Sequence, residues 1–77
     1  MKQISIYSTP TCVYCNAAKD FFAENNIEYL NYDVSVDLGK RREMFEKSGQ
    51  MGVPVIFVDN EMVIGFDKER LTELLSI

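Results

Sequence analysis

The chain has 77 residues, of which 12 are acidic and 8 are basic, and its formal net charge is −4. This length fits one small domain, residues 1–77, and a hydrophobic content of 47% supports a packed core and argues against disorder. The negative charge and the lack of a long basic run exclude a nucleic-acid partner, and no stretch approaches the roughly 20 apolar residues of a membrane span. We therefore expect a monomer with no membrane partner.

The first predicted elements are a strand and a helix joined by a loop that contains both cysteines. Residues 3–7 alternate between polar and apolar side chains, which predicts a short strand, and residues 8–11 form a turn. Over residues 13–25, apolar residues recur at three- and four-residue spacing, which predicts a helix with one apolar face. The residues of that face are Tyr14, Ala17, Ala18, Phe21 and Phe22.

A second strand and a second helix follow. Residues 27–34 are rich in strand-forming side chains. Ser35 is the predicted N-cap of a helix over about residues 36–47, which Ser48 and Gly49 end. The residues that fall on neighbouring turns of this helix are Leu38, Arg41, Arg42 and Phe45.

A hairpin and a third helix complete the pattern. The apolar run of residues 55–58 predicts a strand buried on both faces, and the polar residues 59–61 predict a turn into a strand over residues 62–64. Asp67 is the predicted N-cap of the last helix. The buried stripe of that helix comprises Leu71, Leu74 and Leu75. The order βαβαββα predicts an α/β fold in which three helices flank a mixed four-stranded sheet, because the crossover needs parallel strands and the hairpin adds antiparallel ones.

Cys12 and Cys15 form a Cys-x-x-Cys group at the start of the first predicted helix. A sulfur atom at that position faces unpaired backbone N–H groups and the positive end of the helix dipole, which favours the thiolate. We predict that Cys12 attacks a disulfide and that Cys15, one turn further inside, resolves the mixed disulfide. Tyr14, between them, either lines the substrate groove or is an ordinary, partly exposed aromatic residue.

Two other interpretations of the cysteine pair are weaker. Structural zinc takes four ligands, and the chain has no histidine and no third cysteine, so we predict no metal site. A purely structural disulfide over four residues would constrain the unfolded chain very little. The two cysteines form no secreted-type disulfide framework, and no apolar signal-peptide block follows the first three residues. We therefore expect a reducing, cytoplasmic location.

Pro54 and Gly65 are the other positions with chemical content. Pro54 opens a buried strand and cannot donate to the strand ladder, so it is either a simple strand-start proline or the site of a bend or a cis bond. With a cis bond, the backbone of Val53 would pair with an extended, peptide-like substrate beside Cys12. Gly65, before Asp67, fits either close approach of a carboxylate ligand to a helix N-terminus or a plain turn.

Three segments together resemble the glutaredoxin family: residues 7–15, residues 52–54 before an apolar strand, and residues 64–67 before the last helix. The resemblance covers essentially the whole chain. It implies a thioredoxin fold with a cis bond at Pro54. It also implies an enzyme of electron transport and cell redox homeostasis, which reduces protein disulfides or glutathione mixed disulfides through Cys12 and Cys15. Glutathione is the implied co-substrate, without a tightly bound cofactor. The implied substrate- or glutathione-binding residues are Thr11, Tyr14, Arg41, Val53, Pro54, Gly65, Phe66 and Asp67.

The chain departs from the family pattern in the groove beside the cysteines. Thr9 stands where many glutaredoxins have a lysine that helps to hold a glutathione carboxylate. Arg41 is either an ordinary exposed helix residue or the family's second contact to that carboxylate. The pair Gly65 and Phe66 is similar to the NrdH-type redoxins, which donate electrons to ribonucleotide reductase and are recharged by thioredoxin reductase. A bulky Phe66 would also crowd the glutathione groove, so glutathione and thioredoxin reductase both stay as predicted reductants.

The resemblance also raises a hypothesis of another class, a dimeric module that binds an iron–sulfur cluster. Each subunit would give Cys12, and glutathione would fill the remaining sites. Val13 and Cys15 argue against this hypothesis, because cluster-binding relatives tend to have a small residue after the first cysteine or no second cysteine. A non-catalytic adaptor is the third alternative. The sequence leaves open the physiological substrate and whether a cysteine replaces a native selenocysteine.

Overall fold

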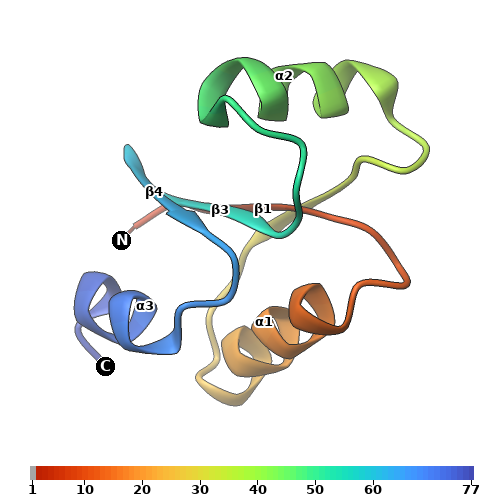
Figure 1. The fold of residues 1–77 in the computed structure, drawn as a ribbon. Coiled ribbons are helices and arrows are strands. Elements are labelled where there is room, and N and C mark those ends of the chain that lie inside the picture. Colours follow the sequence, from red (N-terminus) through yellow and green to blue (C-terminus); the bar gives the residue numbers. More distant parts are fainter. Residues whose placement is uncertain (1) are drawn as a thin grey trace.

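The computed structural model describes residues 2–77 and contains one four-stranded sheet with helices on both faces (Figure 1). The strands are β1 (Ile4–Ser8), β2 (Leu30–Asp33), β3 (Val55–Val58) and β4 (Glu61–Ile64), and the helices are α1 (Val13–Glu24), α2 (Leu38–Ser48) and α3 (Lys68–Leu75). Helices α1 and α3 lie on one face of the sheet, and α2 crosses the other face. The predicted order βαβαββα is confirmed.

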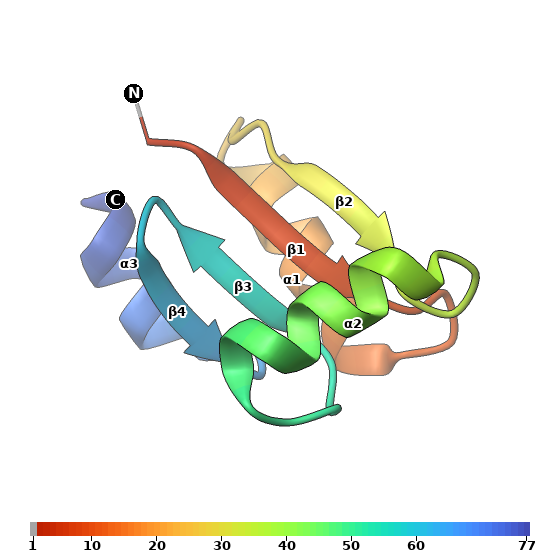
Figure 2. The ribbon, with the colours of Figure 1, turned by 90° about the horizontal axis from the view of Figure 1, so that it is seen from above.

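The strands lie in the order β2-β1-β3-β4, as seen from above in Figure 2. Strand β1 is parallel to β2 and antiparallel to β3, and β3 is antiparallel to β4. The predicted mixed sheet is therefore confirmed. Because β1 and β2 are parallel, their carboxyl ends lie at the same edge of the sheet, and the loop that leaves β1 there leads directly to Cys12.

The larger part of the core lies between the sheet and helices α1 and α3. Ile6 of β1 and Ile56 of β3 are partners in the sheet, and both are fully buried. They pack in one cluster with Ala18 and Phe22 of α1 and Leu71 of α3. Burial of each large side chain in this cluster stabilises the fold by about 1.5–3 kcal/mol. The cluster therefore holds α1 in one position relative to the sheet.

The smaller part of the core lies under α2. It consists of Tyr7, Val34, Met44 and Val55, with Val53 packed against its edge. Met44 is the only residue of α2 that is buried. The apolar contact that holds α2 is therefore small, and polar contacts supply the rest of its attachment.

Helix α2 begins two residues later than predicted. The predicted cap, Ser35, lies in a turn in which its side chain donates to the carboxylate of Asp33, and the backbone N–H of Asp37 bonds to the carbonyl of Asp33. Asp37 is the N-cap instead, and its carboxylate accepts a hydrogen bond from the N–H of Lys40 at 3.0 Å. The prediction of Ser35 was wrong because the turn uses its hydroxyl.

The starts of β2 and β4 and the buried face of α1 also differ from the prediction. Strand β2 begins at Leu30, because the N–H of Ile27 still bonds to the carbonyl of Phe22 at the end of α1. Glu61 belongs to β4 and is the partner of Val58, so the hairpin turn is one residue shorter than predicted. Tyr14, which was predicted to lie on the buried face of α1, is 67% exposed. Cys15 is buried on that face instead.

The last helix follows the prediction. Asp67 is its N-cap, with the carboxylate accepting a hydrogen bond from the N–H of Arg70 at 3.1 Å. Leu71 is fully buried, and Leu74 and Leu75 are partly buried against the same core. None of the helices within residues 2–77 has the length and apolarity to cross a bilayer.

Candidate active site

Cys12 is the N-cap of α1, with an extended backbone and a partly exposed side chain. Its Sγ atom accepts a hydrogen bond from the backbone N–H of Cys15, 3.2 Å away. Its own N–H bonds to the carbonyl of Thr9 and closes the turn before the helix. A sulfur atom at the N-cap lies at the positive end of the helix dipole, so this position stabilises negative charge on Sγ.

Cys15 lies one turn into α1, is fully buried and is a free thiol, as is Cys12. Burial raises the pKa of Cys15 to about 11, and the hydrogen bond with Cys12 acts in the same direction. A backbone hydrogen bond from Thr9 and the charge of Lys19 oppose the rise. The two sulfur atoms therefore differ in access to solvent, and burial keeps Cys15 as a thiol beneath Cys12.

The backbone before β3 approaches Cys12 from the other side. The Val53–Pro54 peptide bond is cis, and Pro54 is fully buried. The Cys12 thiol lies 3.8 Å from the carbonyl oxygen of Val53 and donates to it. Gly65 has a positive φ of 81°, and its N–H bonds to the carbonyl of Pro54 at 2.8 Å. These contacts join the loops before β3 and after β4 into one wall beside Cys12.

Phe66 and Asp67 follow Gly65 at the start of α3. The Phe66 ring packs against the core at 5.8 Å from the Phe21 ring of α1, measured between centroids. This orientation turns the ring towards α1 and weakens the hypothesis that Phe66 crowds the groove. The carboxylate of Asp67 caps α3, so its backbone and side chain are fixed at the helix N-terminus.

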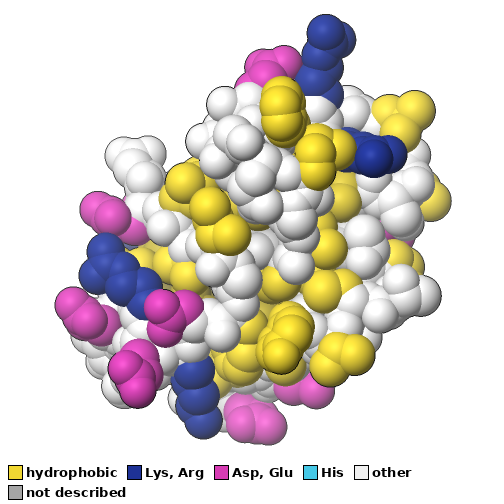
Figure 3. All heavy atoms as spheres, in the orientation of Figure 1, with side chains coloured by type: hydrophobic (Ala, Val, Ile, Leu, Met, Phe, Trp, Pro, Cys, Tyr) yellow, Lys and Arg dark blue, Asp and Glu magenta, His cyan; other side chains and the backbone are white. Residues whose placement is uncertain are grey.

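The other residues predicted for the groove are exposed, and so is Val13 between the two cysteines. Thr11 precedes the cap in an exposed turn, Val13 and Tyr14 are 75% and 67% exposed, and Arg41 is exposed on α2. Figure 3 shows hydrophobic side chains over much of one face, with charged side chains at the top, where Figure 1 places α2, and at the lower left, where it places α3. Hydrogen bonds link Cys12 to Cys15 and to Val53, and Gly65 to Pro54. They do not join Thr11, Tyr14 or Arg41 to the thiols.

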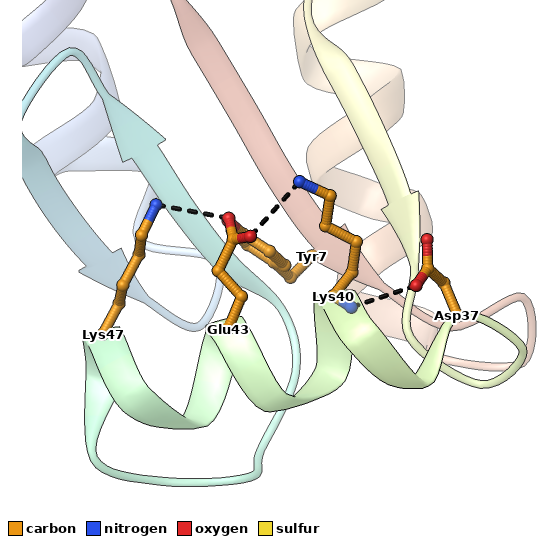
Figure 4. Close-up of polar contacts among 5 residues, drawn as sticks. All are labelled: Tyr7, Asp37, Lys40, Glu43 and Lys47. Atoms are coloured by element: carbon orange, nitrogen blue, oxygen red, sulfur yellow. Dashed lines mark hydrogen bonds and ion pairs between the residues drawn. The ribbon is translucent and has the colours of Figure 1, made fainter.

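Sequence reasoning missed a polar cluster on the α2 side of the same region (Figure 4). The Tyr7 hydroxyl donates to the Glu43 carboxylate at 2.5 Å, and the Nζ atoms of Lys40 and Lys47 each lie 3.3 Å from the same carboxylate. The spacing of Lys40, Glu43 and Lys47 on a helix predicts such ion pairs. Nothing in the sequence pairs Glu43 with Tyr7, which is 36 residues away.

No group of three or more metal-binding side chains occurs in the part of the chain that the structure describes. The chemistry that the geometry supports is thiol chemistry, because a surface sulfur at a helix N-cap contacts both the turn that holds a buried second sulfur and the backbone of Val53.

Comparison with known proteins agrees with this chemistry. The sequence model described as Glutaredoxin matches residues 4–63. A glutaredoxin-like 8.6 kDa protein from the rubredoxin operon of Clostridium pasteurianum is 40% identical over 95% of this chain and 97% of its own length. Glutaredoxin 3 of Escherichia coli K12 is 33% identical over 87% of this chain and 81% of its own length.

A solved structure of a mutant of the thioredoxin-like protein BC3987 superimposes with a TM-score of 0.92 at 35% identity, covering 100% of this chain and 99% of that protein. The match extends over all four strands and three helices, which confirms the thioredoxin fold. This chain therefore belongs to the glutaredoxin family of thiol–disulfide oxidoreductases.

Proposed function

We propose that the chain reduces protein disulfides with Cys12 as the nucleophile and Cys15 as the resolving thiol. The observation that supports this assignment is the position of Cys12 Sγ, which accepts the Cys15 N–H at 3.2 Å and lies 3.8 Å from the Val53 carbonyl. An extended substrate segment that paired with the Val53 backbone would present its disulfide to this sulfur. We assign Thr11, Tyr14, Arg41, Pro54, Gly65 and Asp67 to the walls and rim of the same groove, and we assign Phe66 to a core contact behind its wall.

The reaction has two exchange steps. The Cys12 thiolate attacks one sulfur of the substrate disulfide, the substrate S–S bond breaks, and the second substrate sulfur leaves with the electron pair and takes up a proton. Cys15 then attacks Cys12 Sγ and releases the remaining substrate sulfur, on which the Cys15 proton ends. The substrate gains two electrons, the protein holds a Cys12–Cys15 disulfide, and an external thiol reductant must return two electrons.

Single substitutions at the cysteines test the assignment. We expect Cys12→Ser to abolish disulfide reduction, because serine is no nucleophile for sulfur at neutral pH. We expect Cys15→Ser to stop after the first step and to accumulate a mixed disulfide, detectable by mass spectrometry under non-reducing conditions. Full turnover by the Cys12→Ser variant would refute the proposal, and the captured partners of Cys15→Ser would identify the substrates.

For the electron source, we propose glutathione. Three observations support it. The Phe66 ring is turned towards α1, the positive φ of Gly65 fits close approach of a ligand to its backbone, and Arg41 is exposed on α2. Glutathione with glutathione reductase should then sustain turnover of a disulfide substrate. Failure of that assay while thioredoxin reductase sustains turnover would overturn this point and leave the dithiol assignment intact.

The second candidate is an NrdH-like carrier recharged by thioredoxin reductase. The observation that favours it is Thr9, which gives the groove no cation at the position of the family's lysine. The substitution Thr9→Lys separates the two candidates. If glutathione already recharges the protein, the added lysine should strengthen an existing activity. If thioredoxin reductase does so, the lysine should create an activity that the natural chain lacks.

A further inference from the structure

Helix α2 is attached to the sheet by one carboxylate as well as by one apolar side chain. Glu43 points from α2 to the buried Tyr7 hydroxyl, with Lys40 and Lys47 on either side of it (Figure 4). We call these four residues, Tyr7, Lys40, Glu43 and Lys47, the polar tether. Met44 is the only buried apolar residue of the helix, so the polar tether is a large share of its attachment.

The lysines extend the polar tether to the other strands. The Nζ of Lys40 lies 4.2 Å from the ring centroid of Tyr32 on β2, and the Nζ of Lys47 lies 5.4 Å from that of Phe57 on β3. Both contacts fit cation–π attraction. Glu43 therefore links α2 to β1 directly. The two lysines that pair with Glu43 link α2 to β2 and β3.

The position of α2 is passed on to the active site through a short, braced loop. The loop of residues 49–52 leads from the end of α2 to Val53, and the Gln50 side chain bonds to both the N–H and the carbonyl of Gly52. The Ser48 hydroxyl bonds to the Gln50 backbone as well. Val53 itself packs against the cluster that contains Tyr7 and Met44. A displacement of α2 therefore moves the carbonyl that faces Cys12.

We propose that Tyr7 and Glu43 are positioning residues of the dithiol site. They hold α2 so that the Val53 backbone stands at the correct place for a substrate segment to pair with it beside Cys12. Neither residue touches the sulfur atoms. This role rests on the proposed function, because it assumes that substrate binds along Val53, and it adds a determinant of substrate affinity that lies outside the groove.

The test uses two substitutions that keep the shape of the side chains. Tyr7→Phe removes only the hydroxyl, and Glu43→Gln keeps an acceptor and removes the charge. We expect each substitution to raise KM for a peptide disulfide on the order of three- to tenfold, because small displacements of a positioning group have effects of at least this size. Iodoacetamide should still modify Cys12 in preference to Cys15 in both variants, because the hydrogen bond from the Cys15 N–H to Cys12 Sγ lies within α1 and Cys15 stays buried.

A matched control and a double variant make the test specific. Glu46→Gln removes a carboxylate from the same helix that pairs only with the exposed Arg42, and it should leave KM unchanged. The combined Tyr7→Phe and Glu43→Gln variant should raise KM by less than the product of the two single effects, because both substitutions act on the same hydrogen bond. The proposal is overturned by an unchanged KM in both single variants, or by a KM change that Glu46→Gln reproduces. Loss of the underlying function would show separately, as full turnover by Cys12→Ser.

Discussion

Cys12 and Cys15 belong to the same helical turn but have opposite surroundings. Cys12 is at the cap, where its sulfur meets a backbone N–H and solvent. Cys15 points into the molecule, where it is fully buried. A thiol removed from water resists ionisation, and the positive charge of Lys19 offsets this only in part. Cys15 is therefore kept as a neutral thiol in the reduced protein.

The first prediction is that alkylation at pH 7 separates the two thiols. In the folded, reduced protein, iodoacetamide should modify Cys12 and spare Cys15, because the pKa of Cys15 is raised to about 11 and its sulfur is buried. Peptide mapping by mass spectrometry measures both sites. Reaction of Cys15 should increase as pH rises towards 11, and in denaturant both sites should react. Equal labelling of the two sites in the folded protein at pH 7 would contradict this prediction.

At the scale of the element, α2 depends on a carboxylate whose pKa is displaced. The hydrogen bond from Tyr7 lowers the pKa of Glu43 from 4.5 to about 2, with Lys47 and Lys40 acting in the same direction. Burial raises the pKa of Tyr7, and the hydrogen bond to Glu43 acts in the same direction. A carboxyl group with a lowered folded-state pKa stabilises the fold above its unfolded pKa, and the contribution is lost as pH falls through the folded pKa.

We therefore predict that lowering the pH reduces the difference in free energy of unfolding between the natural protein and the Glu43→Gln variant. At pH 7 the free energy of unfolding of the natural protein should be larger by about 1–1.5 kcal/mol. This value is at or below the low end for a hydrogen bond to a charged group, because the Glu43 side chain is about a third exposed and water screens its charge. The difference should shrink from pH 4.5 towards pH 2. Urea unfolding at several pH values measures it. A difference that stays constant over this range would show that the charge of Glu43 does not stabilise α2.

A second prediction for α2 concerns its apolar contact. Met44→Ala should lower the free energy of unfolding by about 2–5 kcal/mol, because Met44 is fully buried and its removal leaves a cavity. Phe45→Ala, at the next position, removes a side chain that is 48% exposed and should have a much smaller effect. Urea unfolding of both variants decides between them. A larger loss for Phe45→Ala would mean that α2 is rotated relative to the structure described.

How much of each element was predictable depends on whether its cause is local. The caps of α1 and α3 and the buried leucines of α3 follow from short-range pattern, and the structure confirms them. The start of α2 did not follow, since Ser35 and Asp37 are both good caps and only the turn around Asp33 decides between them. The bond between Tyr7 and Glu43 was not predictable, because it depends on how α2 crosses β1.

The same distinction applies to the site. Cys12, Cys15 and Pro54 were predictable because each carries a chemical or conformational signal of its own. The direction of the Phe66 ring was not, because a bulky residue after Gly65 fits a groove wall or a core contact equally well in sequence. The contact with Phe21, on a helix that begins more than fifty residues earlier, decides the matter.

At the scale of the whole molecule, stability should be greatest along the two central strands. Strands β1 and β3 are each hydrogen-bonded on both sides, whereas β2 and β4 are the edges of the sheet. Ile6 and Ile56 on the central pair are fully buried and lie between α1 and α3 on one side, with Tyr7 and Val55 under α2 on the other. Opening these strands exposes both parts of the core, so their amides open only with global unfolding.

Amide hydrogen exchange followed by NMR tests this order. We expect the slowest amides in β1 and β3, with free energies of opening equal to that of global unfolding. Amides of α2 should exchange with a smaller free energy of opening, since one buried side chain and the polar tether hold the helix. Tyr7→Phe should accelerate exchange in α2 and in the loop of residues 49–52 and should leave exchange in α1 and α3 nearly unchanged. If α2 exchanged as slowly as β1 and β3, or if Tyr7→Phe accelerated exchange equally in every element, α2 would not be a separately attached unit. The Val53 backbone would then take its position from the sheet alone.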